Sequence, residues 1–318
     1  MRSLILAGLI AAAFAPAALA AKPAKPAKTA APAAKLDIAV RDLSPKFVEF
    51  YQVASEPVKT EPGKPVENEA DVRWRYFKQG YDFSVHQDEA AARAAFEQAW
   101  PRYPAVMKQI EGGFDAMTPK VDQMLSTLAD QYYFTKPLTL RFVSYVGTFE
   151  GRVWSEQDGD RTNIYLPLET GPETRALPLA RLLSRMMLDK ELPWPNGRPR
   201  NLAEQIIAEG VLAHGLSAAV PGQPDEAYLD LPAAKLAELK QNKPQVLRSI
   251  IPLLKSGADD TLATYRSDKL AEARYAGWML VKGFRGSQKA QLADLIRQNP
   301  NDLVRASELM LAGLAKSK

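Results

Sequence analysis

The stretch Leu138-Thr-Leu-Arg-Phe-Val-Ser-Tyr-Val146 decides the fold, because the hydrophobic pattern changes its period there. Its β-branched and aromatic residues favour an extended strand. Residues 151–154 and 162–168 have a similar composition, so we expect the three segments to form a small antiparallel sheet. Apolar residues recur at helical spacing on both sides of this region, and the predicted fold class is therefore α+β.

Helices are predicted before and after the sheet. Ahead of it, the pattern predicts helices over residues 44–54, a short aromatic segment between 74 and 83, 87–112 with bends at Pro101 and Pro104, and 119–133 with Thr118 as the N-cap. Behind it, helices are expected over residues 177–188, 201–219, 232–254, 267–284, 287–297 and 301–315. A sheet-containing half to about residue 170 and a helical half then form one domain, residues 36–318, with a ligand cleft between the halves.

The first 20 residues have the pattern of a cleavable signal peptide. One positive charge at Arg2 precedes an apolar run over residues 4–14 and small residues that end at Ala20. We therefore expect cleavage near Ala20 and a periplasmic or secreted protein. No later stretch reaches the roughly 18 apolar residues that a membrane-spanning helix needs, and the absence of cysteine excludes both a lipoprotein anchor and disulfides.

Residues 21–35 contain almost only alanine, proline and lysine, which predicts a disordered tether. Five of the 41 basic residues lie within the first 35 positions, where no acidic residue occurs. The rest of the chain thus has 36 basic and 37 acidic residues, so the pI of about 9.0 describes the N-terminal part. This balance gives no support to nucleic-acid binding, whereas the lysines could make a weak contact with the cell wall or an anionic surface.

The chain has few residues suited to catalysis or metal binding. Its two histidines are His86, expected in a loop, and His214, which follows Glu209 by five positions. On a helix these two side chains point about 140° apart and cannot bind one metal ion. There is no Gly-x-Ser-x-Gly elbow, phosphate loop or dinucleotide fingerprint, and the acidic run over residues 156–160 is expected to be a hairpin turn. No metal site and no cofactor are predicted.

The order of elements from residue 162 nevertheless carries a resemblance. A strand, a helix, a basic loop rich in proline over residues 192–200, and a helix with the dipeptide Glu209-Gly210 follow one another. This order resembles a bacterial family of predicted zinc-dependent proteases related to the gluzincins. In that family the first helix has the motif His-Glu-x-x-His and the second supplies a glutamate within Glu-Gly. The resemblance implies a gluzincin-like fold over most of the chain after residue 40, with Glu209 and more weakly Tyr275 as candidate catalytic residues.

The zinc motif itself is missing from this chain. Arg181-Leu-Leu-Ser-Arg185 stands where the motif is expected, and a guanidinium group has no lone pair with which to bind zinc. Because residues 181 and 185 share a helical face, we expect one or both arginines to pair with Glu209 in place of the metal. The alternative is that both arginines face solvent and that Glu209 is an ordinary helix carboxylate.

The preferred prediction is a non-catalytic protein with a protease-like fold that holds a peptide, a protein or a small ligand in a cleft lined by Arg181, Arg185, Glu209 and Tyr275. An active hydrolase with a carboxylate site is the alternative, since Asp189, Glu191 and Glu204 lie near Glu209 in the sequence and could act as acid and base. A structural protein tethered to the cell wall by the lysine-rich segment is the third possibility.

Overall fold

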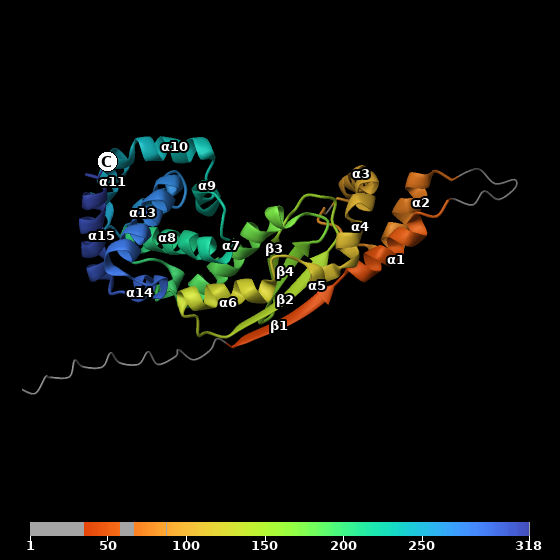
Figure 1. The fold of residues 1–318 in the computed structure, drawn as a ribbon, viewed down its shortest axis with the longest axis horizontal. Coiled ribbons are helices and arrows are strands. Elements are labelled where there is room, and N and C mark those ends of the chain that lie inside the picture. Colours follow the sequence, from red (N-terminus) through yellow and green to blue (C-terminus); the bar gives the residue numbers. More distant parts are fainter. Residues whose placement is uncertain (1–34, 58–66, 87, 318) are drawn as a thin grey trace, which may run out of the picture. The chain divides into compact units, whose positions relative to one another are not determined.

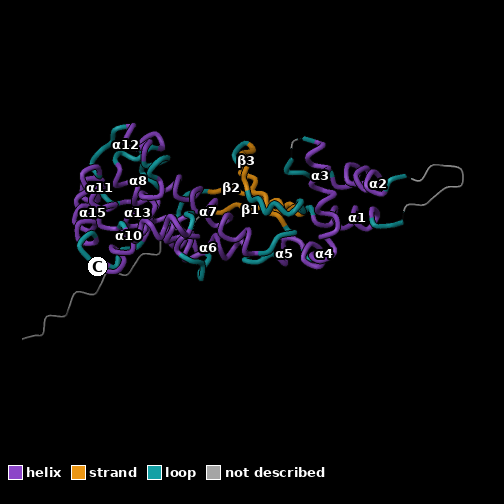
Figure 2. Tube along the Cα trace, turned by 90° about the horizontal axis from the view of Figure 1, so that it is seen from above, coloured by secondary structure: helices purple, strands orange, loops and turns teal. Residues whose placement is uncertain are grey.

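The computed structural model describes residues 35–57, 67–86 and 88–317. The predicted signal peptide and nearly all of the predicted tether lie outside these residues. Figures 1 and 2 show helices and a small sheet.

The strands are β1 Leu36–Asp42, β2 Leu138–Tyr145, β3 Trp154–Asp158 and β4 Arg161–Pro167. The α-helices are α1 Ser44–Ala54, α2 Glu69–Tyr76, α3 Glu89–Ala99, α4 Tyr103–Glu111, α5 Gly113–Ala116, α6 Val121–Tyr132, α7 Pro172–Glu191, α8 Leu202–Ala219, α9 Asp225–Leu229, α10 Ala233–Gln241, α11 Lys243–Ile250, α12 Asp259–Thr264, α13 Leu270–Gln288, α14 Leu292–Arg297 and α15 Pro300–Leu314.

The four strands form a mixed sheet in the order β1-β2-β4-β3. Strand β1 is parallel to β2, β2 is parallel to β4, and only β3 is antiparallel to its neighbour β4. The α+β class is confirmed, but the prediction of an antiparallel sheet is wrong, and β1 was not predicted. The chain between β1 and β2 passes through α1 to α6, which is long enough for the crossover that parallel strands require.

The helices between β1 and β2 pack around a cluster of aromatic side chains. The rings of Phe47 and Tyr103 lie 4.9 Å apart, and those of Phe77 and Phe96 also lie 4.9 Å apart. The cluster is linked to the end of β2, because the Tyr103 hydroxyl donates to the carbonyl oxygen of Gly147 at 2.9 Å. The predicted helix over residues 87–112 is divided by a 3-10 turn, Trp100–Arg102, that contains Pro101.

Helix α8 is the centre of the helical half, and 14 of its 18 residues are buried. It contacts α6, α7, α13, α14 and α15. Its closest neighbour is α13, because the two backbones meet at Gly210 and Gly277. A Cβ atom added to Gly210 would lie 2.1 Å from the carbonyl oxygen of Gly277, and one added to Gly277 would lie 2.2 Å from that of Ile206. Only glycine fits on both sides of this crossing.

The six helical segments predicted after the sheet are all helical and in the predicted order, but their ends differ, and the short helices α9 and α12 were not predicted. Helix α7 is longer than predicted, and the segment over residues 232–254 is divided into α10, α11 and the 3-10 turn Ile251–Leu253. Helix α6 begins at Val121 with Lys120 as its N-cap, so Thr118 is not the cap. No helix in the described part of the chain is long and apolar enough to cross a membrane.

Candidate functional site

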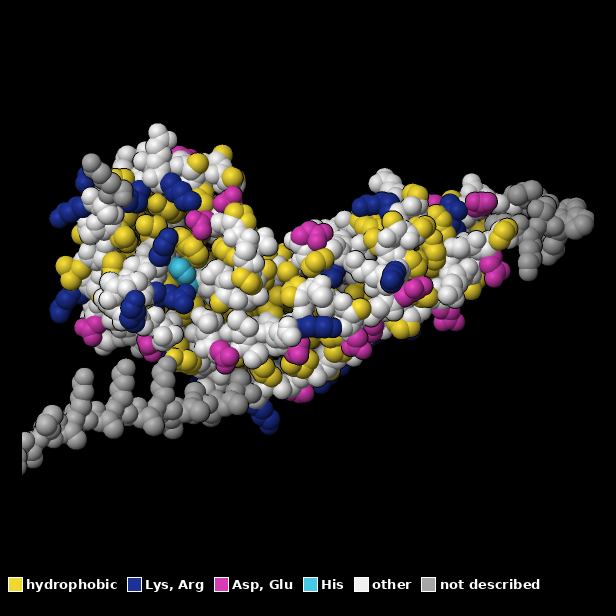
Figure 3. Space-filling view, viewed as in Figure 1, with side chains coloured by type: hydrophobic (Ala, Val, Ile, Leu, Met, Phe, Trp, Pro, Cys, Tyr) yellow, Lys and Arg dark blue, Asp and Glu magenta, His cyan; other side chains and the backbone are white. Residues whose placement is uncertain are grey.

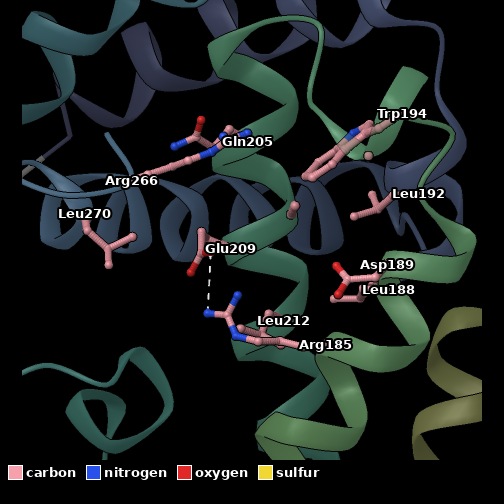
Figure 4. A pocket seen from close by; sticks show the side chains of 12 residues that line it. Arg185, Leu188, Asp189, Leu192, Trp194, Gln205, Glu209, Leu212, Arg266 and Leu270 are labelled. Carbon is pink, nitrogen blue, oxygen red and sulfur yellow. Dashed lines mark ion pairs between the residues drawn. The ribbon is translucent and has the colours of Figure 1, made fainter. Parts of the chain in front are cut away.

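A cavity of about 330 Å³ lies beside α8 and includes Arg185 and Glu209. Figure 4 shows the side chains that line it. Helix α7 supplies the Arg185 side of the cavity, α8 supplies Glu209, and Trp194 belongs to the loop between these helices. The cavity therefore lies within the helical half, and the prediction of a cleft between the sheet half and the helical half does not describe it. Its lining residues are Arg185, Leu188, Asp189, Leu192, Trp194, Gly197, Gln205, Ala208, Glu209, Leu212, Arg266 and Leu270.

Glu209 is held by two guanidinium groups. Its Oε2 atom lies 3.3 Å from Nε of Arg274, which donates a hydrogen bond, and its Oε1 atom lies 3.7 Å from Nη2 of Arg185. The side chains of Glu209 and Arg274 are 16% and 12% exposed, whereas Arg185 is 45% exposed. The expected pairing of Glu209 with an arginine of α7 is therefore present through Arg185, and the closer partner, Arg274, was not predicted.

The ion pairs continue from Glu209 to the end of α9. Arg274 also donates through Nη1 to the carboxylate and the carbonyl oxygen of Asp230, at 3.1 and 2.9 Å. Arg181 lies 3.6 Å from the same carboxylate and donates to the carbonyl oxygen of Ala227 at 2.9 Å. We call Arg181, Arg185, Glu209, Asp230 and Arg274 the arginine–carboxylate network. It contains three cations and two anions and links α7, α8, α13 and the end of α9.

The residues at this place do not fit a zinc ion. A zinc site needs several deprotonated nitrogen, oxygen or sulfur donors around one point, but the groups that face Glu209 here are guanidinium donors. Among the described residues, no group of three or more histidine, aspartate or glutamate side chains could hold a metal ion. The chemistry of the donors therefore excludes zinc ligation of the protease type at Glu209.

A second hollow, of about 680 Å³, adjoins the network on the side of α9. Arg185 lines both hollows, while Arg181 and Asp230 line the second one only. Its other walls include Val153 ahead of β3 and Leu177 near the start of α7. This second hollow thus extends from the helical half toward the sheet.

Of the four residues predicted to line the cleft, Tyr275 alone lines neither hollow. It follows Arg274 on α13, but its side chain is 2% exposed and belongs to the hydrophobic core. Burial raises the pKa of its hydroxyl above the usual value. Tyr275 therefore has a packing role beside the network.

The carboxylates proposed for the alternative enzyme separate into two groups. Glu204 accepts hydrogen bonds from the backbone N–H and the guanidinium of Arg200, and Glu191 accepts from Arg297 and from the N–H of Thr135. Both are thereby occupied in structural contacts. Only Asp189 lies in the cavity with Glu209. Its carboxyl reaches solvent, but the cavity walls displace water from it and raise its pKa above the usual value.

Neither histidine lies in the cavity. His214 is buried on the far side of α8, where its ring stacks on Trp278 at 3.9 Å and its Nε2 atom lies 3.2 Å from the carbonyl oxygen of Trp278. Burial lowers the pKa of His214 to about 4, so its imidazole is neutral at pH 7. His86 lies 2.7 Å from a carboxylate oxygen of Glu150 in the loop after β2.

A buried carboxyl, Glu169, lies where β2 and β4 end. It is 2% exposed, accepts a hydrogen bond from the N–H of Gly147 at 2.9 Å, and has one oxygen without a hydrogen-bond partner. Burial raises its pKa to about 7. No motif in the sequence marks Glu169, because it is a single glutamate after a strand.

Comparison with known proteins leaves the family open. No protein-family model matches the chain, and no curated protein matches it. The resemblance to the zinc-dependent proteases accordingly rests on the order of elements and on Glu209-Gly210.

Proposed function

We propose that this chain is an exported, non-catalytic protein that binds a short peptide or a similar small zwitterion in the cavity beside Glu209. The observation that carries the proposal is the contact of Glu209 with Arg185 and Arg274 at the wall of a cavity. A carboxylate whose oxygens already face two guanidinium groups has no free site for a metal ion. The cavity then serves for binding, and the signal peptide expected over residues 1–20 supports export of the chain.

The lining of the cavity indicates the class of ligand. Arg266 and Asp189 both line it, and neither forms an ion pair with another described residue. These two charges suit the carboxylate and the ammonium group of one zwitterionic ligand. Gln205 also lines the cavity, and its buried side chain donates through Nε2 to the carbonyl oxygen of Leu262. Leucine side chains and the half-buried Trp194 supply apolar walls.

The test is calorimetric titration of the mature chain with a panel of dipeptides and tripeptides. Arg266→Ala and Asp189→Asn are each expected to weaken binding roughly tenfold or more, because each removes a hydrogen bond to a charged group. Arg305→Ala is the matched control, since Arg305 is an exposed arginine on α15 and lines neither hollow. Equal affinities for the two cavity variants and the control would reject this cavity as the binding site.

A carboxylate-dependent hydrolase is the second candidate, favoured by Asp189 and Glu209 in one cavity. The two candidates differ in turnover and in metal content. For the binding protein we expect no stoichiometric zinc in elemental analysis of the purified mature chain and no cleavage of a fluorogenic peptide pool. Stoichiometric zinc, or cleavage that Glu209→Gln abolishes, would favour the hydrolase. Co-sedimentation with cell-wall sacculi, lost on removal of residues 21–34, would favour the third possibility, a tethered structural protein.

A further inference from the structure

Strand β1 forms one edge of the sheet, and only its β2 side is paired with another strand among the described residues. Figure 1 shows β1 along the lower margin of the ribbon. The C=O of Lys35 and the N–H of Leu43, at the two ends of β1, bond to β2. In an extended strand, the backbone N–H and C=O groups of successive residues point to opposite sides. Residues 35 and 43 direct these groups toward β2, so the N–H and C=O groups of Ile38 and Val40 face away from β2. The edge therefore offers backbone donors and acceptors to another strand.

The side chains of this edge are also exposed. Ile38 is 42% and Val40 is 49% exposed, and they are two of the four large hydrophobic residues with such exposure in the described part of the chain. Figure 3 shows hydrophobic and charged side chains together along the same margin. Asp37 and Arg41 are exposed too, and neither forms an ion pair with a described residue. Natural edge strands are usually protected by a covering element or by inward-pointing charges.

The sequence of β1, Leu36-Asp-Ile-Ala-Val-Arg-Asp42, is complementary to itself when two copies run antiparallel about Ala39. Asp37 of each copy then stands opposite Arg41 of the other. Ile38 of each copy likewise stands opposite Val40 of the other. This register also pairs the free backbone groups. The N–H and C=O groups of Ile38 and Val40 face outward, and in this register Ile38 of one copy and Val40 of the other can exchange hydrogen bonds.

We propose that two copies of this chain associate through β1 in this register and form a continuous eight-stranded sheet. The two-fold axis passes beside Ala39, so the same patch serves both copies. The pairing neutralises the charges of Asp37 and Arg41 and covers the exposed apolar side chains. It also covers part of a hollow of about 450 Å³ that Ile38 lines together with Phe114 and Phe142.

The register predicts which single cysteine forms a cross-link between copies. The chain has no cysteine of its own, so an introduced thiol can react only with its copy. Ala39 faces Ala39 of the second copy in a non-hydrogen-bonded pair, where Cα atoms lie about 4.5 Å apart, within the range for a disulfide. Ala39→Cys in the full mature chain is thus expected to give a covalent dimer on mild oxidation. Arg41→Cys is the matched control on the same strand, because its partner is Asp37 and not itself.

The charges supply an independent test without a cross-link. Light scattering of the full mature chain over a hundredfold dilution series is expected to show a dimer that dissociates on dilution. Asp37→Arg should abolish the dimer by placing like charges opposite each other, and the double reversal Asp37→Arg with Arg41→Asp should restore it. Asp160→Arg, at the exposed turn after β3, should have no effect. A monomer at every concentration, a dimer that survives Asp37→Arg, or equal cross-linking of Ala39→Cys and Arg41→Cys would overturn the proposal.

Discussion

Replacement of Gly210 by alanine tests the helix crossing that places Glu209 beside Arg274. The added methyl group would lie 2.1 Å from the carbonyl oxygen of Gly277, and because this neighbour is backbone it cannot rotate away. Helices α8 and α13 then have to separate by about 1 Å, and such overpacking against backbone costs about 3 kcal/mol, the upper end of the usual range. The better helix propensity of alanine offsets about 0.5 to 1 kcal/mol of this cost. The expected net loss of about 2 to 3 kcal/mol lowers the melting temperature by roughly 5 to 10 °C in a domain of this size.

The assay is thermal and urea unfolding of Gly210→Ala beside two further variants. Gly277→Ala should be destabilised to a similar extent, because its methyl group would lie 2.2 Å from the carbonyl oxygen of Ile206. Gly286→Ala, on α13 as well, has open space around the added methyl group and should be stabilised by about 0.5 kcal/mol. If the melting temperature of Gly210→Ala were close to that of Gly286→Ala and not to that of Gly277→Ala, the close crossing and the packing role of Gly210 would be refuted.

Three further predictions concern charged and titratable groups. Glu209→Gln should lower the free energy of unfolding, measured in urea, by about 1 to 2 kcal/mol. This is less than the loss expected for a fully buried ion pair, because Arg274 keeps its bonds to Asp230. If Glu209→Gln lowered the free energy of unfolding equally in the Arg274→Met background, the two side chains would not be coupled. Burial raises the pKa of Glu169 to about 7, so the stability due to its protonated form is present below about pH 4.5 and lost as pH rises through 7. Glu169→Gln should therefore be the more stable protein at pH 8, by up to about 3 kcal/mol, and a variant that is less stable at pH 8 would contradict this. Burial lowers the pKa of His214 to about 4 in the folded protein. As pH falls from about 6.5 toward 4, this histidine is protonated in the unfolded chain but not in the folded one, so the free energy of unfolding should decrease over that range. His214→Phe should show a smaller loss over that range in the same titration.

The α+β class and most helices could be predicted because their signals are local. Apolar spacing over ten or more residues predicted α1, α7, α8 and α15. The ends of α1 agree with the prediction, and those of the other three helices differ from it by up to five residues. The pairing of the strands could not be predicted in this way. Three strands separated by short connections suggested hairpins, but the neighbours of β2 are β1, about 100 residues earlier in the chain, and β4. Strand β1 was missed because its alternation spans only seven residues after the segment rich in alanine and proline.

The site was partly predicted for a similar reason. Arg185 and Glu209 could be paired from the helical spacing of α7 and from the order of the helices. Arg274 could not, since its contact with Glu209 depends on the crossing of α8 and α13. A signal for that crossing is present in the sequence: Gly210 and Gly277 lie inside helical patterns, where glycine is costly unless two backbones approach closely.

The same crossing changes the meaning of the dipeptide Glu209-Gly210. In the protease-like interpretation, the dipeptide is a remnant of a metal site. In this fold the role of each residue can be explained without a metal. Gly210 allows the backbone of α13 to approach α8 closely. Glu209 pairs with Arg274 of α13 and Arg185 of α7. Three guanidinium groups in one region would repel each other if Glu209 and Asp230 were absent. The arginine–carboxylate network therefore fixes the distance between α7 and α13, and with it the width of the cavity, by charge pairing in place of metal coordination.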